Sequence, residues 1–366
     1  MSLRITSRTR RRHLVVAATA LLTLVGVSAT SSSATERSAS AEPVTLRLGY
    51  FPNVTHAPAI VGVDSGTFAE ALGPDVTLEL SHFNAGGEAI EALLSGAIDA
   101  TFIGPNPAIN GFAQSNGEAV RIVAGTTSGG ASLVVAEGID SPDDLAGATL
   151  ASPALGNTQD VALRAWLTEN GFTTDTAGGG DVEVVNVENA EALTLFRDGA
   201  LDGAWVPEPW ATRLVLEGGG HVLVDERDLW PDGEFVTTHL IVATPFLEGQ
   251  PDVVSGLLDG LVDTIDTINA DPAAALTATN DGIETITTNR LADETIAGAF
   301  ENLTFTVDPI AASLQGSADD AIAVGLLEEV DLTGIYDLAL LNEILAERGL
   351  DAVSDELTAT ETTEPA

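Results

Sequence analysis

One helix–strand–turn pattern occurs twice in this chain of 366 residues. Residues 95–107 read SGAIDATFIGPNP, and residues 198–209 read DGALDGAWVPEP. In both, a glycine follows an amphipathic helix, where helices commonly end in a left-handed residue. A short apolar strand with one aromatic residue comes next, and then a proline-rich turn. Gly, Ala and Asp are common here, so a chance match is the alternative, but the aromatic residue and the prolines match as well. We therefore predict two α/β lobes built alike.

The alternation of strands and helices predicts mostly parallel sheets flanked by helices. We expect the first lobe to span 44–133 plus 238–350 and the second to span 134–237. Two crossings, near Ser132 and Thr238, would form a hinge. Ligands of open α/β sheets bind beyond the carboxyl ends of the strands, which predicts a cleft between the lobes with Phe102 and Trp205 near its walls. The tail, 352–366, lacks periodicity and is predicted to be disordered.

The N-terminus has the organisation of an export signal. Four arginines between residues 8 and 12 precede an apolar stretch over 14–27, and Ala-Ser-Ala at 39–41 is a suitable cleavage site. Cleavage after Ala29 is a second possibility, and the arginine pair fits a twin-arginine signal as well as an ordinary secretory one. We expect residues 1–41 to be removed and the protein to be exported to the periplasm or the cell surface. The chain has no cysteine, so we expect no lipid anchor on such a residue.

The charge is strongly negative, with a formal net charge of −41 at pH 7. The leader holds six of the 14 basic residues and one of the 55 acidic ones, which leaves 8 arginines against 54 acids. Nucleic-acid binding depends on cations that neutralise phosphates, so this balance argues against it. Arg164 and Arg213 lie inside predicted helices, and we expect each of them to lie on the surface or to pair across the two lobes.

Several segments resemble a known family: LRLGYFPN at 46–53, EALLSGAID at 91–99, DSPDDLAG at 140–147, GNTQ at 156–159 and DGAWVPEPW at 202–210. They are similar to periplasmic substrate-binding proteins of ABC importers, within the nitrate, sulfonate and taurine group that also contains binders of thiamine precursors. The resemblance implies a two-lobed periplasmic-binding-protein fold of type II with two hinge crossings. It also implies delivery of a small ligand to an ABC permease in the membrane. We expect a monomer.

The turn after the first strand holds the first candidate ligand contacts. Tyr50 and Phe51 either stack on a ligand or pack in the core. Asn53 either contacts the ligand or makes the turn. His56 either donates to an anion or caps the next helix.

Predicted helix starts supply further candidates, because their free N–H groups and dipole attract anions. These candidates are Asn84, Gly86 and Gly87; Gly104 and Asn106; and Asn157, Thr158 and Gln159. The alternative is that the asparagines only cap helices. Thr126, Ser128 and Gly129 add donors at the cleft edge, or they form an ordinary loop.

The segment 205–210 is the densest cluster of large and charged side chains. Glu208 either pairs with a ligand ammonium or ring N–H, or only places charge at a helix N-terminus. Trp205 and Trp210 either enclose an apolar chain or ring, or one of them belongs to the core. His239 falls at the second crossing and is a further candidate.

The leading hypothesis is a solute-binding protein for a small organic anion, an aliphatic sulfonate such as an alkanesulfonate or taurine. The alternatives are a heteroaromatic vitamin precursor of pyrimidine or riboflavin type, and nitrate. An enzyme on the same fold and a structural protein are weaker alternatives. The five histidines show no metal-ligand spacing, and nucleophile-elbow, phosphate-loop and dinucleotide motifs are absent. We therefore expect no catalytic residue, metal or cofactor.

Overall fold

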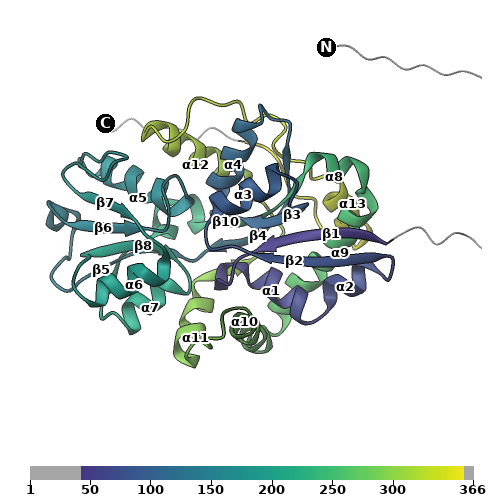
Figure 1. The fold of residues 1–366 in the computed structure, drawn as a ribbon, viewed down its shortest axis with the longest axis horizontal. Helices are drawn as coiled ribbons and strands as arrows, with labels where there is room; N and C mark the ends of the chain where they lie inside the picture. The colour runs from purple at the N-terminus through teal and green to yellow at the C-terminus, as the bar shows by residue number, and fades with distance from the viewer. Residues whose placement is uncertain (1–42, 358–366) are drawn as a thin grey trace, which may run out of the picture. The chain divides into compact units, whose positions relative to one another are not determined.

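The computed structural model describes residues 43–357, which form two α/β lobes, each built on its own sheet (Figure 1). The first sheet contains, in spatial order, β11 (Leu303–Phe305), β4 (Val120–Gly129), β10 (Val236–Ala243), β3 (Ala100–Ile103), β1 (Val44–Tyr50) and β2 (Val76–His82). The second contains β7 (Glu183–Asn186), β6 (Thr149–Ser152), β8 (Gly203–Pro207), β5 (Ala131–Val135) and β9 (His221–Asp225). The two-lobed α/β fold is therefore confirmed.

Both sheets are mixed, whereas mostly parallel sheets were expected. β1 runs parallel to β2 and β3, but β10 is antiparallel to β3 and β4. In the second sheet, β6 is parallel to β7 and β8, and β5 is antiparallel to β8 and β9. The antiparallel pairs arise where the chain leaves one lobe and returns to it, because such pairs need no helical crossover.

The chain passes between the lobes at Gly130 and again between β9 and β10. Gly129 and Gly130 have φ of 77° and 75°, a conformation that glycine adopts without steric cost. β5 joins the second sheet from Ala131 onward, and β10 joins the first from Val236, so each crossing comes earlier than the predicted position. The predicted loop at 126–131 is mostly the end of β4.

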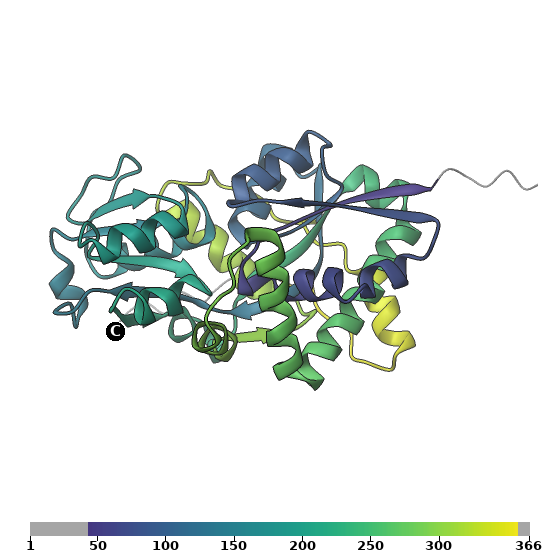
Figure 2. The same cartoon turned by 60° about the horizontal axis from the view of Figure 1, so that its bottom comes forward.

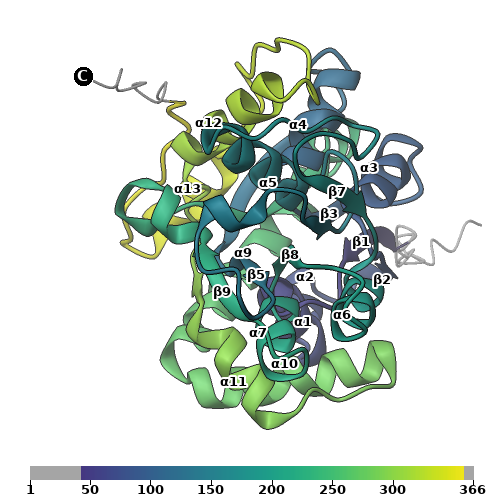
Figure 3. The same ribbon diagram turned by 90° about the vertical axis from the view of Figure 1, so that its left-hand side faces the viewer.

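Helices cover both faces of each sheet (Figures 1 and 2). Those of the first lobe are α1 (Ala57–Asp64), α2 (Thr67–Leu72), α3 (Gly86–Leu94), α4 (Pro105–Gln114), α8 (Thr244–Gly249), α9 (Pro251–Ala270), α10 (Pro272–Thr287), α11 (Asp293–Glu301), α12 (Ala311–Ala323) and α13 (Ala339–Glu347). The second lobe has α5 (Thr158–Glu169) on one face and α6 (Asn189–Arg197) and α7 (Trp210–Leu216) on the other (Figure 3). Short 3₁₀ turns are η1 (Val54–His56), η2 (Pro142–Leu145), η3 (Glu226–Leu229) and η4 (Pro231–Gly233).

The repeated pattern has the predicted local structure. Gly96 and Gly199 follow α3 and α6 with φ of 73° and 71°, and the strands β3 and β8 come next. The aromatic residues of the repeat do not form cleft walls, however. Phe102 is fully buried and stacks on Phe68, with ring centroids 6.2 Å apart, and Trp205 is fully buried beside Trp166 in the second lobe.

The last described residues, 352–357, have defined contacts rather than the predicted disorder. The backbone N–H of Val353 donates to Asn342 Oδ1 at 2.9 Å, and its carbonyl accepts from Asn342 Nδ2 at 3.1 Å. Residues 358–366 and the predicted signal peptide, 1–41, lie outside the described residues. Within 43–357, none of the helices combines the length and apolar composition needed to cross a bilayer.

Candidate ligand-binding site

A small cavity of about 40 Å³ lies between the lobes, and we call it the inner cavity. It is lined by Phe51, Asn53, Thr55, His56, Gly86, Gly104, Pro107, Asn157, Thr158, Gln159, Pro207 and Thr237. A single water molecule needs roughly 10–15 Å³ by this measure, so the space suits a compact polar group.

Three helix N-termini meet at the inner cavity. α3 begins at Gly86, α4 begins after Gly104, and α5 begins after Asn157. None of the three receives a hydrogen bond from the side chain of its N-cap residue. The first N–H groups of α3 and α5 have no partner within their helices and are available to an anion. α4 begins with Pro105 and has a second proline at Pro107, so it contributes mainly the positive end of its dipole.

Two glycines allow the helix starts to approach one another. A Cβ on Gly104 would lie 2.6 Å from Thr158 Oγ1, on the other lobe. A Cβ on Gly86 would lie 2.3 Å from Pro107 Cγ and 3.3 Å from Asn157 Oδ1. Distances below 3.0 Å are essentially never seen for a real Cβ, so a side chain at either position would push its neighbours apart.

His56 supplies a buried imidazole to the same cavity. The side chain is only 3% exposed, and its ring lies 4.6 Å from that of Phe51, centroid to centroid. Its Nδ1 has no hydrogen-bond partner among residues 43–357. Burial lowers the pKa of His56 to about 3, so the ring is neutral at pH 7 and offers one N–H donor.

A buried ion pair holds the start of α5 in place. Asp160 Oδ2 accepts from the backbone N–H of Gly156 at 2.9 Å and from Arg164 Nε at 3.1 Å. Asp160 Oδ1 accepts from Ser152 Oγ at 2.6 Å and from Asn186 Nδ2 at 2.8 Å. Arg164 is therefore a core residue, 1% exposed, and neither the surface residue nor the inter-lobe partner that the sequence suggested. Its place four residues after Asp160 was the sequence signal for this pair.

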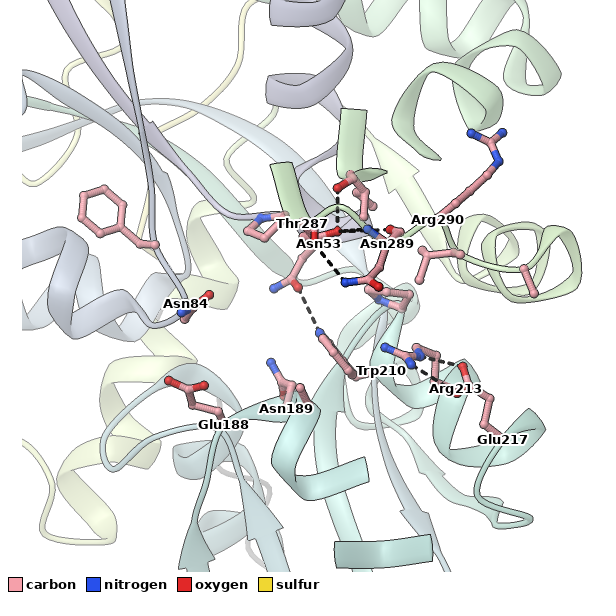
Figure 4. Close-up of a pocket in the computed structure, with 17 residues that line it drawn as sticks. Asn53, Asn84, Glu188, Asn189, Trp210, Arg213, Glu217, Thr287, Asn289 and Arg290 are labelled. Atoms are coloured by element: carbon pink, nitrogen blue, oxygen red, sulfur yellow. Dashed lines mark hydrogen bonds and ion pairs between the residues drawn. The ribbon is translucent and has the colours of Figure 1, made fainter. Parts of the chain in front are cut away.

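A larger space of about 710 Å³, which we call the outer cavity, adjoins Asn53 (Figure 4). Asn53 lines both cavities, and its Oδ1 accepts from Trp210 Nε1 at 3.0 Å, which joins the two lobes. The guanidinium of Arg213 lies over the Trp210 ring, 4.7 Å from its centroid, and its Nε donates to Glu217 Oε1 at 2.6 Å. Asn84 also lines the outer cavity rather than the inner one.

Some predicted site residues lie in the protein core, away from both cavities. Tyr50 is buried with its ring edge-on to His82, and burial raises its pKa to about 12. Asn106 is buried and donates to the carbonyl of Ser317 at 2.9 Å. Trp205 donates through Nε1 to Glu226 Oε2 at 2.7 Å. Local sequence cannot fix these orientations, because each depends on an element distant in the chain.

Glu208 and His239 are also engaged elsewhere. Glu208 is 1% exposed, and its Oε1 accepts from Asn302 Nδ2 at 2.7 Å and from Thr212 Oγ1 at 2.9 Å. Burial raises the pKa of Glu208, although these hydrogen bonds oppose the shift. His239 is fully buried with Nε2 3.3 Å from the carbonyl oxygen of Pro309, and burial lowers its pKa to about 4.

The remaining candidates have structural positions. Thr126 is fully buried and donates to the carbonyl of Thr238 at 2.9 Å, while Ser128 and Gly129 pair with neighbouring strands in β4. Gly87 follows Gly86 in α3 but faces open space. Sequence reasoning missed Thr55 and Thr237, which line the inner cavity as small polar residues without a distinctive motif.

With this geometry established, the comparisons with known proteins become informative. The model of the NMT1-like family matches residues 39–280, about two thirds of the chain. The chain belongs to the NMT1-like family. One relative of this NMT1-like chain is the taurine-binding periplasmic protein of Escherichia coli (strain K12), 28% identical over 233 residues, or 63% of this chain and 69% of the relative.

Another relative is the bicarbonate-binding protein CmpA of Synechococcus sp., 26% identical over 247 residues, which are 61% of this chain and 53% of CmpA. The NMT1-like chain thus spans about half the length of CmpA. Among solved structures, the alkanesulfonate-binding protein SsuA from Xanthomonas axonopodis pv. citri gives a TM-score of 0.66 at 20% identity, covering 79% of this chain and 96% of SsuA. At that identity the likeness shows the fold alone.

Proposed function

We propose that the protein is the solute-binding component of an ABC importer and captures a small organic anion, an aliphatic sulfonate, in the inner cavity. One observation carries the proposal: three helix N-termini without side-chain caps meet there beside a buried histidine whose Nδ1 lacks a partner. Relatives that bind taurine and bicarbonate support the same class of ligand. The role is binding without chemistry.

The donors suit an anion whose charge is spread over several oxygens. Backbone N–H groups at the starts of α3 and α5 border the cavity, α4 adds the positive end of its dipole, and His56 adds one ring N–H. No arginine or acidic side chain is among the lining residues of the described chain. Helix dipoles and fixed N–H groups therefore supply the stabilisation, at sites that need no reorganisation when the ligand arrives.

Capture follows from closure of the lobes. Asn53 and Gly104 belong to the first lobe, whereas Trp210 and Thr158 belong to the second, and these residues meet at or beside the inner cavity. A ligand that contacts both lobes stabilises the closed arrangement by its differential affinity for that state. The closed protein would then deliver the ligand to a permease in the membrane, which works with an ATP-binding component.

The heteroaromatic alternative loses much of its basis. It relied on Trp205, Trp210 and Glu208, and of these Trp205 and Glu208 are hydrogen-bonded inside the protein, whereas Trp210 lines the outer cavity. Nitrate and bicarbonate would use the same donors as a sulfonate, so they remain comparison ligands. Export through the signal at 1–41 and a monomeric state remain predictions from the sequence.

A thermal-shift titration tests the proposal, with taurine, methanesulfonate, nitrate and bicarbonate as ligands. A ligand that binds only the folded state at a hundredfold excess over Kd adds about 2.7 kcal/mol of stability, which is easily measured. We expect stabilisation by sulfonates and its loss in His56→Phe, which keeps a ring but removes the N–H. His221→Phe is the control, because His221 Nε2 lies 3.0 Å from the carbonyl oxygen of Ile139, away from both cavities. The proposal fails if no sulfonate stabilises the protein.

A further inference from the structure

The two cavities differ greatly in size. The inner cavity, at about 40 Å³, has room for a compact anionic head group, whereas the outer cavity measures about 710 Å³. Cavities that bind small molecules enclose most of the ligand surface. A ligand no larger than taurine would leave the outer cavity unused.

The two cavities share one lining residue, Asn53. Asn53 Oδ1 accepts a hydrogen bond from Nε1 of Trp210, which lines the outer cavity (Figure 4). A ligand whose head group occupies the inner cavity can therefore extend past this pair into the outer one. Such a ligand can replace the lost bond by offering its own acceptor to the Trp210 indole or its own donor to Asn53.

Besides four charged residues and several apolar ones, the outer cavity is lined by uncharged polar groups and by two aromatic rings, Phe83 and Trp210. Amide and hydroxyl side chains come from both lobes: Asn53, Asn84, Asn189, Thr287 and Asn289. Asn189 Oδ1 is buried and has no hydrogen-bond partner among the described residues, so a donor in the ligand could satisfy it.

Both arginines that line this cavity are already paired, whereas Glu188, which also lines it, has no ion-pair partner among residues 43–357. Arg213 is paired with Glu217, and Arg290 is paired with Asp281 and Glu284. Neither guanidinium is left to bind a second anionic group. Arg213 instead packs against Trp210, which holds the indole at the cavity wall. A neutral ring bearing hydroxyl or amide groups matches this lining better than a second negative charge or a plain hydrocarbon, because its donors can bond to Glu188 and the amides.

We infer that the outer cavity receives a neutral, polar ring of monosaccharide size that is attached to the anionic head group, so that the ligand is a sugar sulfonate or a compound of that class. This inference rests on the proposed function, since it requires the sulfonate head to lie in the inner cavity. Trp210 provides the stacking surface and the surrounding amides provide the hydrogen bonds.

Calorimetric titration of the purified protein tests the inference with methanesulfonate, benzenesulfonate and glucose 6-sulfonate. We expect glucose 6-sulfonate to bind at least tenfold more tightly than methanesulfonate, and more tightly than benzenesulfonate. Trp210→Ala removes one bond between the lobes for every ligand, but it should reduce the affinity for the sugar sulfonate at least tenfold more than the affinity for methanesulfonate. Trp210→Phe, which keeps a ring, should retain most of the affinity, and thermal denaturation checks that both variants are folded.

Equal affinities for methanesulfonate and glucose 6-sulfonate would overturn the inference and leave the proposed function intact. Tighter binding of benzenesulfonate than of the sugar sulfonate would refute the claim that the outer cavity prefers a polar ring. If Trp210→Ala reduced the affinities for methanesulfonate and for the sugar sulfonate equally, the inference would also be refuted, because Trp210 would then act on binding of the head group and not of the ring. Absence of binding by all three would refute the proposed function itself.

Discussion

Replacing Gly104 with alanine should prevent the lobes from closing around a ligand. Gly104 has φ of −71° and ψ of 162°, which alanine adopts without strain. Its new Cβ, however, would lie 2.6 Å from Thr158 Oγ1 on the opposite lobe, whereas ordinary contact begins near 3.4 Å. Closure would therefore stop about 0.8 Å short at this point. Overpacking of this kind costs about 1–3 kcal/mol, which corresponds to roughly fivefold to 150-fold in affinity.

The assay is a double-mutant cycle on the affinity for a sulfonate. The affinities of wild type, Gly104→Ala, Thr158→Ala and the double variant are compared, because Thr158 also borders the inner cavity. Once Oγ1 is removed, the nearest atoms to the new Cβ are Thr237 O at 3.6 Å and Thr158 Cβ at 3.7 Å, both ordinary contacts. Gly104→Ala should therefore cost little affinity in the Thr158→Ala background. Gly87→Ala is the matched control, since its Cβ meets nothing within 4 Å.

Measuring the free energy of unfolding shows whether Gly104→Ala impairs closure of the lobes or the stability of the fold. In the open form the new methyl group meets no opposite lobe, and Gly→Ala at a compatible position stabilises by about 0.4–1 kcal/mol through the unfolded state. We expect Gly104→Ala to lose affinity without a comparable loss of stability. An equal loss of affinity with and without the Thr158 hydroxyl would refute the steric explanation.

Three further outcomes are expected. Burial raises the pKa of Glu226 to about 7 from an unfolded value near 4.5, so the stability from its protonated form is complete below pH 4.5 and lost as the pH rises through 7. In urea unfolding, Glu226→Gln should gain roughly 2–3 kcal/mol more stability at pH 8 than at pH 5, and an equal gain at both pH values would contradict this. Arg164→Met should cost about 3–5 kcal/mol in the same assay, because Asp160 stays buried without its cation, whereas exposed Arg197→Met should change stability by less than about 0.5 kcal/mol. Wild-type stability should rise between 0.05 and 1 M NaCl as salt screens the net negative charge, and a flat response would argue against dominant self-repulsion.

The sequence predicted local structure well where the signals were local. Gly96 and Gly199 end their helices in the left-handed conformation, as the repeated pattern indicated. Most of the residues predicted at helix starts border the inner cavity, because a helix N-terminus presents its donors whatever side chains surround it. His56 is there too, although the sequence left open whether it would cap a helix.

The sequence was a poor guide to the direction in which large or charged side chains point. Glu208 looked like a cleft residue because it lies between two prolines, and Trp205 because it lies on a strand that ends at the expected cleft. In the structure Trp205 bonds to Glu226 and Glu208 bonds to Asn302. Arg164 looked exposed because a charged residue inside a helix usually is, but Asp160 and the carbonyl of Asp175 hold it in the core. In each case the deciding partner lies in another element.

By itself, then, the amino-acid sequence determined the order of strands and helices, where many of them end, the two-lobed α/β class and the donors carried by the helix starts. These properties follow from hydrophobic periodicity, glycine and proline, which act over a few residues. Only the tertiary structure decided which donors share one cavity and where the chain crosses between lobes. The contact between Asn53 and Trp210 spans 157 residues, and such contacts depend on how two separately folded sheets pack rather than on any local pattern.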